Sequence, residues 1–390
     1  MNEQQTGARE GRSTASPRRI AVIDVGSNSV KALVADVVDG TLREVDGSTE
    51  VTRVARGASA RGTLDPAALA ATRAAVAAGV ELADRCGATR VLAAATGGLR
   101  LAPDPARAAA AIGAGLIELP VLAPEVEAHL SLLGVRAGAG WPAALGVIDL
   151  GGASTEISWL GPDGIRTTSV AAGAVTLTEL FLTSDPPARQ ELDALDGWLA
   201  GQLPAASPRA APPPASSLPA APSPAAPPRA APPPAAQPRA ALPPAGAPSP
   251  PPLHAVGGTL TALACVAGGI PVRRVAETHG VVLRRDRIET VTAWLERTSS
   301  AALQSELGLA PGRADLLVAG AHLALALLDH LGSPELRVSS WGMRHGLALA
   351  AGQDVDPRRD PTLALALARR PAPRSPRRPE SPRPRNHRKV

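Results

Sequence analysis

The sequence predicts an α/β fold built from two similar halves with a cleft between them. Two stretches share one layout: IAVIDVGSNSVKALVADV from Ile20 to Val37, and VIDLGGASTEIS from Val147 to Ser158. In each, an apolar run ends at an aspartate, a turn containing glycine follows, and a second strand returns. Two copies about a domain length apart are typical of a duplicated fold, and 390 residues suffice for two domains.

The first half is expected at residues 18–138, after a leader at residues 1–17 whose composition favours disorder. Beyond the opening hairpin, Asp65-Pro66 predicts a helix start, because aspartate caps free N–H groups and proline fits the first turn. A buried strand then leads to the turn Thr96-Gly97-Gly98, and another helix starts at Asp104-Pro105. This alternation of strands and helices favours an α/β domain.

The second half is expected at residues 139–352. It is interrupted at 204–252, where 20 of the chain's 41 prolines forbid a helix or sheet and indicate a low-complexity insertion. The insertion is either an inert loop expansion or a docking site for a proline-binding module. Afterwards a strand runs into Gly257-Gly258-Thr259 and a helix, whose N-terminus is a natural anion or nucleotide site. Residues 353–390 are expected to form a basic disordered tail.

Composition and charge limit the classes of function. Hydrophobic residues make up 45% of the chain and aromatic residues 2%, so its cores must be packed from small aliphatic side chains. Residues 357–390 carry a net charge of +9 against +5 for the whole chain, which leaves −4 for the remainder and predicts no specific nucleic-acid surface. Two cysteines without paired spacing suit a reducing compartment, and no uninterrupted apolar run reaches membrane-spanning length. We therefore expect a cytoplasmic protein without a membrane partner.

Several polar residues suggest anion and cation chemistry. Glycines in both turns let the backbone approach a ligand closely, so several N–H groups could converge on an anion. Asp149 and Glu156 could reach a divalent cation, and Arg100, just after a strand end, could hold a phosphate bidentately. Simpler explanations remain open: a hairpin needs no ligand, Arg100 could form a surface ion pair, and Glu125 and Glu127 suit the first turn of a helix.

Five segments, taken in order, resemble the exopolyphosphatase and guanosine pentaphosphate phosphatase (Ppx/GppA) family. They are IDVGSNSVK, ATGGLR, EVEAHLSLLGV, VIDLGGASTEIS and VGGTLTALA. The resemblance covers Ile20 to Leu349 apart from the insertion. It implies the actin-like ATPase fold, with two ribonuclease-H-like domains and an active site in the cleft. It also implies removal of terminal phosphate from inorganic polyphosphate or guanosine pentaphosphate (pppGpp) with the help of Mg²⁺ or a similar divalent cation.

The resemblance also implies a role for individual residues. Glu127 would be the catalytic base that deprotonates a water aimed in line at the terminal phosphorus. Asp24, Asp149 and Glu156 would hold the metal and its waters, and Arg100 would stabilise charge on the transferred phosphoryl group. The residues expected to bind phosphate are Gly26, Ser27, Asn28, Ser29, Gly151, Gly152, Ala153, Ser154, Thr155, Gly257, Gly258 and Thr259.

The chain departs from the family pattern at several positions of the expected site. Ala153 replaces a third glycine, and Val126 replaces the first of two glutamates. Ala123-Pro124 replaces Ser-Gly, and Gly97-Gly98 replaces Ser-Ala. Alanine is harmless unless its backbone needs a positive φ. Since Glu127 remains, we expect activity, either weak or selective.

Four functions compete on the sequence. The leading one is a Mg²⁺-dependent exopolyphosphatase, followed by hydrolysis of guanosine pentaphosphate. Sugar kinase chemistry on the same fold ranks low because no sugar-binding insertion is recognisable. A non-catalytic sensor of polyphosphate or an alarmone, signalling through the proline tract or the tail, is kept open by the altered loops, although the retained Glu127 favours the enzyme. Chain-length preference is left open, and so is a homodimer, which the resemblance allows.

Overall fold

The computed structural model describes residues 16–58, 63–162, 164–203 and 252–369. Most of the expected leader, nearly all of the proline-rich insertion and the last 21 residues of the chain therefore lie outside the described residues. Both cysteines lie within them, and both are free thiols.

The first half contains a four-stranded mixed sheet in the order β3-β2-β1-β4. Its central strand β1 is antiparallel to β2 and parallel to β4, and both of its faces are covered, which explains its nearly continuous apolar sequence. The strands are β1 Arg18–Val25, β2 Ser29–Val38, β3 Thr41–Val51 and β4 Arg90–Ala95.

The second half repeats this arrangement in a six-stranded sheet in the order β7-β6-β5-β8-β10-β9. Strand β5 is antiparallel to β6 and parallel to β8, as β1 is to β2 and β4. The repeated pattern in the sequence thus corresponds to a repeated strand arrangement. The strands are β5 Leu145–Leu150, β6 Thr155–Gly161, β7 Gly164–Val170, β8 Leu253–Val256, β9 Val282–Arg284 and β10 Glu335–Val338.

One face of the first sheet packs on α2 (Pro66–Arg85) and α4 (Pro105–Gly113). Both helices start where the sequence predicts, because Asp65 Oδ1 accepts the Ala67 N–H at 2.7 Å and Asp104 Oδ1 accepts the Arg107 N–H at 3.0 Å. The turn expected after β4 is instead a single helical turn, α3 (Gly97–Arg100).

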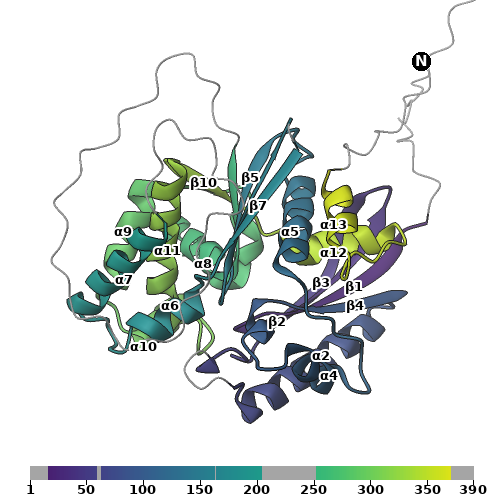
Figure 1. Cartoon of the computed structure of the whole chain (residues 1–390), viewed down its shortest axis with the longest axis horizontal. Helices are drawn as coiled ribbons and strands as arrows, with labels where there is room; N and C mark the ends of the chain where they lie inside the picture. Colours follow the sequence, from purple (N-terminus) through teal and green to yellow (C-terminus); the bar gives the residue numbers. More distant parts are fainter. Residues whose placement is uncertain (1–15, 59–62, 163, 204–251, 370–390) are drawn as a thin grey trace, which may run out of the picture.

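The other face of the first sheet packs on α12 (Met343–Gly352), which in turn packs on α5 (Pro124–Gly138). Helix α5 also lies against strands β5 to β8 of the second sheet, and α13 (Pro361–Ala368) packs on α5. Figure 1 shows α12 and α13, at the yellow end of the colour scale, beside α5. Helices α5 and α12 meet at glycines, since a Cβ on Gly134 would lie 2.1 Å from the Gly342 carbonyl oxygen. Helices α12 and α13 therefore brace α5, and α12 also reaches back to the first sheet.

Two expectations for the C-terminal region were wrong. Helix α12 lies within residues 139–352, yet it packs on the first sheet rather than in the second half. Residues 353–369, expected in a disordered tail, contain α13, whose Leu367 is 4% exposed in the core around α5. Arg358 anchors this segment by donating from Nη1 to the Ala93 carbonyl oxygen at 2.7 Å. The net charge of this segment could not reveal the helix, because its three buried residues, Ala364, Leu367 and Ala368, are apolar and pack on α5, which is distant in the sequence.

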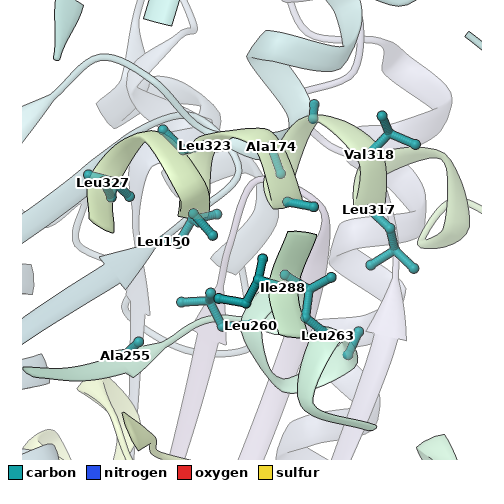
Figure 2. Close-up of a cluster of buried hydrophobic side chains, with 14 of the residues drawn as sticks. Leu150, Ala174, Ala255, Leu260, Leu263, Ile288, Leu317, Val318, Leu323 and Leu327 are labelled. Atoms are coloured by element: carbon teal, nitrogen blue, oxygen red, sulfur yellow. The ribbon is translucent and has the colours of Figure 1, made fainter. Parts of the chain in front are cut away.

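The second sheet packs on a layer of leucine- and alanine-rich helices (Figure 2). By length and composition alone, residues Ala314–Leu331 could cross a membrane, and the bent pair α8 and η1 passes the same test when joined. However, 61% of the Ala314–Leu331 window is buried, as in the core helix of a globular domain. The elements are α6 Ala174–Phe181, α7 Arg189–Gln202, α8 Gly258–Gly268, η1 Val272–Thr278, α9 Arg285–Leu295, α10 Ser300–Leu307, η2 Ala314–Leu316 and α11 Leu317–Leu331.

Candidate active site

A cavity of about 260 Å³ lies between the two halves. Its walls come from the β1–β2 turn and α5 of the first half, and from the β5–β6 turn, the start of α8 and the start of α12. The predicted site residues that line it are Asp24, Gly26, Ser27, Asn28, Ser29, Glu127, Asp149, Gly151, Gly152, Ala153, Ser154, Gly257, Gly258 and Thr259. Segments far apart in the sequence thus converge as the pattern predicts.

The two glycine turns are closed by the same hydrogen bond. The Gly26 N–H donates to the Ser29 carbonyl, and the Gly151 N–H donates to the Ser154 carbonyl, each at 3.0 Å. A Cβ on Gly151 would lie 2.8 Å from that carbonyl oxygen, so only glycine permits this tight turn. Both turns therefore present their backbone to the cavity in the same compact form.

The first turn also touches both α3 and the second turn, and its contact with α3 explains one departure from the family pattern. A Cβ on Gly98 would lie 2.5 Å from Ser27 Cα, and a Cβ on Gly152 would lie 2.7 Å from Ser27 Cβ. Glycine at position 98 therefore lets α3 pack directly on the first turn. Ala153 is not among the residues with positive φ, so alanine introduces no backbone strain there.

The third glycine turn joins β8 to α8. Gly257 has φ +124°, and a Cβ there would lie 2.3 Å from the Leu150 carbonyl oxygen, so this position requires glycine. The first residues of α8, Gly258 and Thr259, line the cavity. The helix N-terminus contributes partial positive charge and free N–H groups to the same space.

Three acidic side chains line the cavity. Asp24 and Asp149 stand near the ends of the equivalent strands β1 and β5, and Glu127 lies in the first turn of α5, 9% exposed. Burial raises the pKa of Asp24 and of Asp149. The pKa of Glu127 is raised well above its usual range, first by burial and then by the charge of Glu156. These carboxylates therefore form an acidic group in which ionisation is disfavoured.

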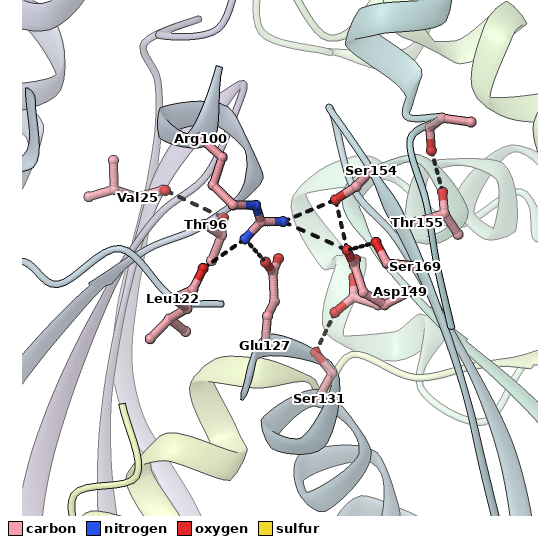
Figure 3. A network of polar contacts seen from close by, with 12 residues as sticks. Val25, Thr96, Arg100, Leu122, Glu127, Ser131, Asp149, Ser154, Thr155 and Ser169 are labelled. Atoms are coloured by element: carbon pink, nitrogen blue, oxygen red, sulfur yellow. Dashed lines mark hydrogen bonds and ion pairs between the residues drawn. The ribbon is translucent and has the colours of Figure 1, made fainter. Parts of the chain in front are cut away.

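Arg100 lies between Glu127 and Glu156 and contacts both carboxylates (Figure 3). Its Nη1 donates to the Leu122 carbonyl oxygen at 3.0 Å and to Glu127 Oε2 at 2.8 Å. Its Nη2 donates to Ser154 Oγ at 3.2 Å and lies 3.7 Å from Glu156 Oε1. One guanidinium thus links α5 of the first half to the β5–β6 turn of the second.

Arg100, Thr155 and Glu156 are not among the residues that line the cavity. Glu156 is 2% exposed, and its Oε1 accepts hydrogen bonds from Ser154 at 2.8 Å and Ser169 at 3.0 Å. The Thr155 hydroxyl donates to the Ala172 carbonyl oxygen at 2.6 Å. Burial, and next the charge of Asp149, raise the pKa of Glu156 to about 7. These residues support the site rather than face its contents.

Three cations also line the cavity: Lys31, Arg313 and Arg344. We did not predict them as site residues. Lys31 is paired with Asp24 across β1 and β2, and burial, followed by the charge of Arg344, lowers its pKa to about 8. One signal was available, because Lys31 is one of only two lysines in a chain with 40 basic residues. Arg313 and Arg344 reach the cavity only through the packing of distant segments.

The carboxylates of the cavity suit a cation whose remaining ligands are phosphate and water oxygens. Among the residues with described positions, no group of three or more histidine, cysteine or acidic side chains is arranged to hold a metal. Within that same part of the chain, the buried Oδ1 of Asp24 has no hydrogen-bond partner. Mg²⁺ commonly uses one or two carboxylates together with phosphate oxygens and waters, so Asp24 and Asp149 fit it as ligands.

The chain is similar to known phosphatases in sequence. The model of the Ppx/GppA phosphatase family matches residues 33–211. Exopolyphosphatase 2 of Mycobacterium tuberculosis is 38% identical over 190 residues, which are 45% of this chain and 58% of that protein. The chain thus aligns with little more than half of that relative. Exopolyphosphatase 1 of the same species is 27% identical over 341 residues, covering 85% of this chain and 87% of that protein.

The fold is similar to that of a solved structure. The crystal structure of an Aquifex aeolicus member of the Ppx/GppA family superposes with a TM-score of 0.63 at 23% identity, covering 87% of this chain and 99% of that one. This likeness confirms the expected actin-like ATPase fold, with one sheet in each half.

Proposed function

The chain belongs to the Ppx/GppA phosphatase family, and from this premise we propose that it is an exopolyphosphatase, a hydrolase that releases terminal phosphate from inorganic polyphosphate. One observation carries the proposal. Three glycine turns that can bind phosphate, three carboxylates and three cations line a single cavity. A polyanion needs N–H groups and cations along its length, whereas hydrolysis needs a base at its end.

Glu127 is our candidate for the base. It lines the cavity from the first turn of a helix that α12 and α13 brace, so its backbone is held firmly. Its raised pKa makes it a stronger base once it is ionised, and the positive charge of Arg100 favours the ionised form. The water would attack the terminal phosphorus in line, and the N–H groups of the glycine turns would stabilise the charge on the phosphoryl oxygens.

Mg²⁺ or a similar divalent cation would polarise the terminal phosphoryl group and neutralise its charge when bound. Asp24 and Asp149 would hold it, with Glu156 acting through Ser154 and Arg100. The charges of these aspartates partly offset burial and the charge of Arg344, which together lower the pKa of Lys31 to about 8. Lys31, Arg313 and Arg344 would bind the remaining phosphates of the chain.

Arg100 does not line the cavity, so it could stabilise a phosphoryl group only by leaving Glu127 and turning towards the cavity. Its Nη1 is hydrogen-bonded to Glu127, and a guanidinium bonded to a carboxylate cannot offer the same N–H to a phosphate. An incoming phosphoryl group with more negative charge would compete for Arg100. Glu127 would then lose the positive charge that favours its ionised form, and a bound divalent cation would have to replace that charge.

Hydrolysis of guanosine pentaphosphate uses the same residues and remains the nearest alternative. Binding of polyphosphate or an alarmone without hydrolysis is the non-enzymatic alternative. A cytoplasmic location and a homodimer remain expectations.

The test is phosphate release from short polyphosphate, long polyphosphate and guanosine pentaphosphate, each with Mg²⁺ and with EDTA. We expect Mg²⁺-dependent release from polyphosphate and none with EDTA. Release from guanosine pentaphosphate alone would replace the substrate that we propose. Binding of these compounds without any release would favour the sensor.

A further inference from the structure

Asp149 receives a hydrogen bond that the sequence did not predict. Ser131 Oγ donates to Asp149 Oδ2 in a short hydrogen bond, and Ser131 is only 1% exposed (Figure 3). The bond joins helix α5 of the first half to strand β5 of the second. A hydrogen bond to a buried charged group is worth more than one between neutral groups.

The position of Ser131 links this bond to Glu127. Ser131 follows Glu127 by four residues on α5, so the two side chains lie on the same face, one turn apart. Glu127 lines the cavity, whereas Ser131 contacts the aspartate beside it. The same helical face therefore carries the proposed base and holds the proposed metal ligand.

The two cavity aspartates differ in what holds them. In the described part of the chain, Asp24 Oδ1 is buried without a hydrogen-bond partner. Asp149, in contrast, has one oxygen fixed by Ser131. A carboxylate fixed at one oxygen presents the other in a defined direction, as hydrogen bonds behind metal ligands commonly do.

We propose that Ser131 is a positioning residue that orients Asp149 for a divalent cation and fixes its distance from Glu127. This inference rests on the proposed function for the identity of the metal ligand, but not on which phosphate compound is the substrate. Without the hydroxyl, Asp149 would rotate, and the cation would bind more weakly.

The test uses Mn²⁺ as a spectroscopic substitute for Mg²⁺, titrated in the full chain with inorganic phosphate present and followed by electron paramagnetic resonance. We expect Ser131→Ala to weaken Mn²⁺ binding about tenfold, in the range found when hydrogen bonds behind metal ligands are removed. Ser131→Thr keeps the hydroxyl and should restore most of the affinity. Ser131→Cys keeps the shape of the side chain but has a larger atom and only a weak donor, so it should weaken binding even if the alanine variant folds poorly.

Ser158→Ala is the matched control. Ser158 is 2% exposed and its hydroxyl bonds only to Thr167 at 3.1 Å among the contacts of the described chain, so its loss should leave Mn²⁺ affinity unchanged. Equal affinity for Ser131→Ala and wild type would overturn the inference, as would an equal loss in Ser158→Ala. Unchanged Mn²⁺ binding in Asp149→Asn would overturn it too. Mn²⁺ binding with the expected differences but no phosphate release would contradict only the proposed function.

Discussion

Glu127, Asp24 and Asp149 show what a residue pattern can predict. Each follows from a recognisable segment, and all three line the cavity. Ser131 and Arg344 could not be found in this way, because nothing local marks a serine whose partner lies in another strand, or an arginine that reaches the cavity from a distant helix. Glu156 lies close to where it was expected, but faces Arg100 and two serines instead of the cavity.

Gly98→Ala tests how closely the turns must pack. The new Cβ would lie 2.5 Å from Ser27 Cα, so the first glycine turn has to move. We expect the free energy of unfolding to fall by about 1–3 kcal/mol, as for other overpacked sites, and KM for polyphosphate to rise. Urea unfolding and steady-state kinetics measure the two effects.

Gly197→Ala provides the control for that substitution. Nothing lies within 4 Å of a Cβ at Gly197 on α7, so alanine should leave KM unchanged and stabilise the helix slightly. If Gly98→Ala behaves like Gly197→Ala, then close packing of α3 on the first turn is not needed for phosphate binding.

Among the elements, the strands before the glycine turns and the helices after Asp65 and Asp104 were predictable, because apolar runs and caps are local signals. The return of α12 and α13 to the first half was not. Helix α12 packs closely on α5 at Gly346, where a Cβ would lie 2.0 Å from the Leu130 carbonyl oxygen. The segment that contains α13 is held by the hydrogen bond from Arg358 to the Ala93 carbonyl oxygen. Such contacts join residues more than 200 positions apart.

Three helices of the second half are joined through one histidine, which predicts a pH-dependent stability. His322 of α11 bonds to Asp196 of α7 at 2.6 Å and to Glu296, after α9, at 3.0 Å. Burial lowers the pKa of His322, but the hydrogen bonds and charges of the two carboxylates outweigh it, and the pKa is raised overall. The stabilisation is therefore full below the unfolded pKa, about 6.5, and is lost as pH rises through the higher folded pKa.

His322→Gln should remove this dependence. We expect the difference in Tm between wild type and the variant to be largest near pH 6 and to shrink at higher pH. Burial lowers the pKa of His129, His254 and His345, so these residues act in the opposite direction and at lower pH. A Tm difference that is constant from pH 6 to 9 would contradict the role of the charged imidazole.

At the scale of the whole molecule, the two halves are also joined beside the cavity, next to its lining residues Asn28 and Arg313. Arg53, with φ 54°, forms a short ion pair with Asp315, and its N–H donates to the Asn28 carbonyl oxygen at 3.0 Å. The Asn28 side chain in turn donates to the Gly312 carbonyl oxygen at 3.1 Å. The first glycine turn is thus tied to the segment that carries Arg313.

Arg53→Ala should loosen this connection. Because the pair is partly exposed, we expect its loss to weaken the free energy of polyphosphate binding by about 1 kcal/mol or less. This loss should appear as a two- to fivefold rise in KM for polyphosphate with a smaller change in kcat. Arg189→Ala, which removes an exposed pair within α7, should change neither. Equal KM values for Arg53→Ala and wild type would show that polyphosphate binding does not depend on this pair.

The most direct test of the whole account compares wild type with Glu127→Gln in Mg²⁺-dependent phosphate release from polyphosphate, with polyphosphate binding measured on the same samples. Glutamine keeps the size of the side chain but cannot accept a proton, so we expect kcat to fall about 10²- to 10⁴-fold while binding is retained. Release by Glu127→Gln at the wild-type rate would contradict the assignment of Glu127 as the base.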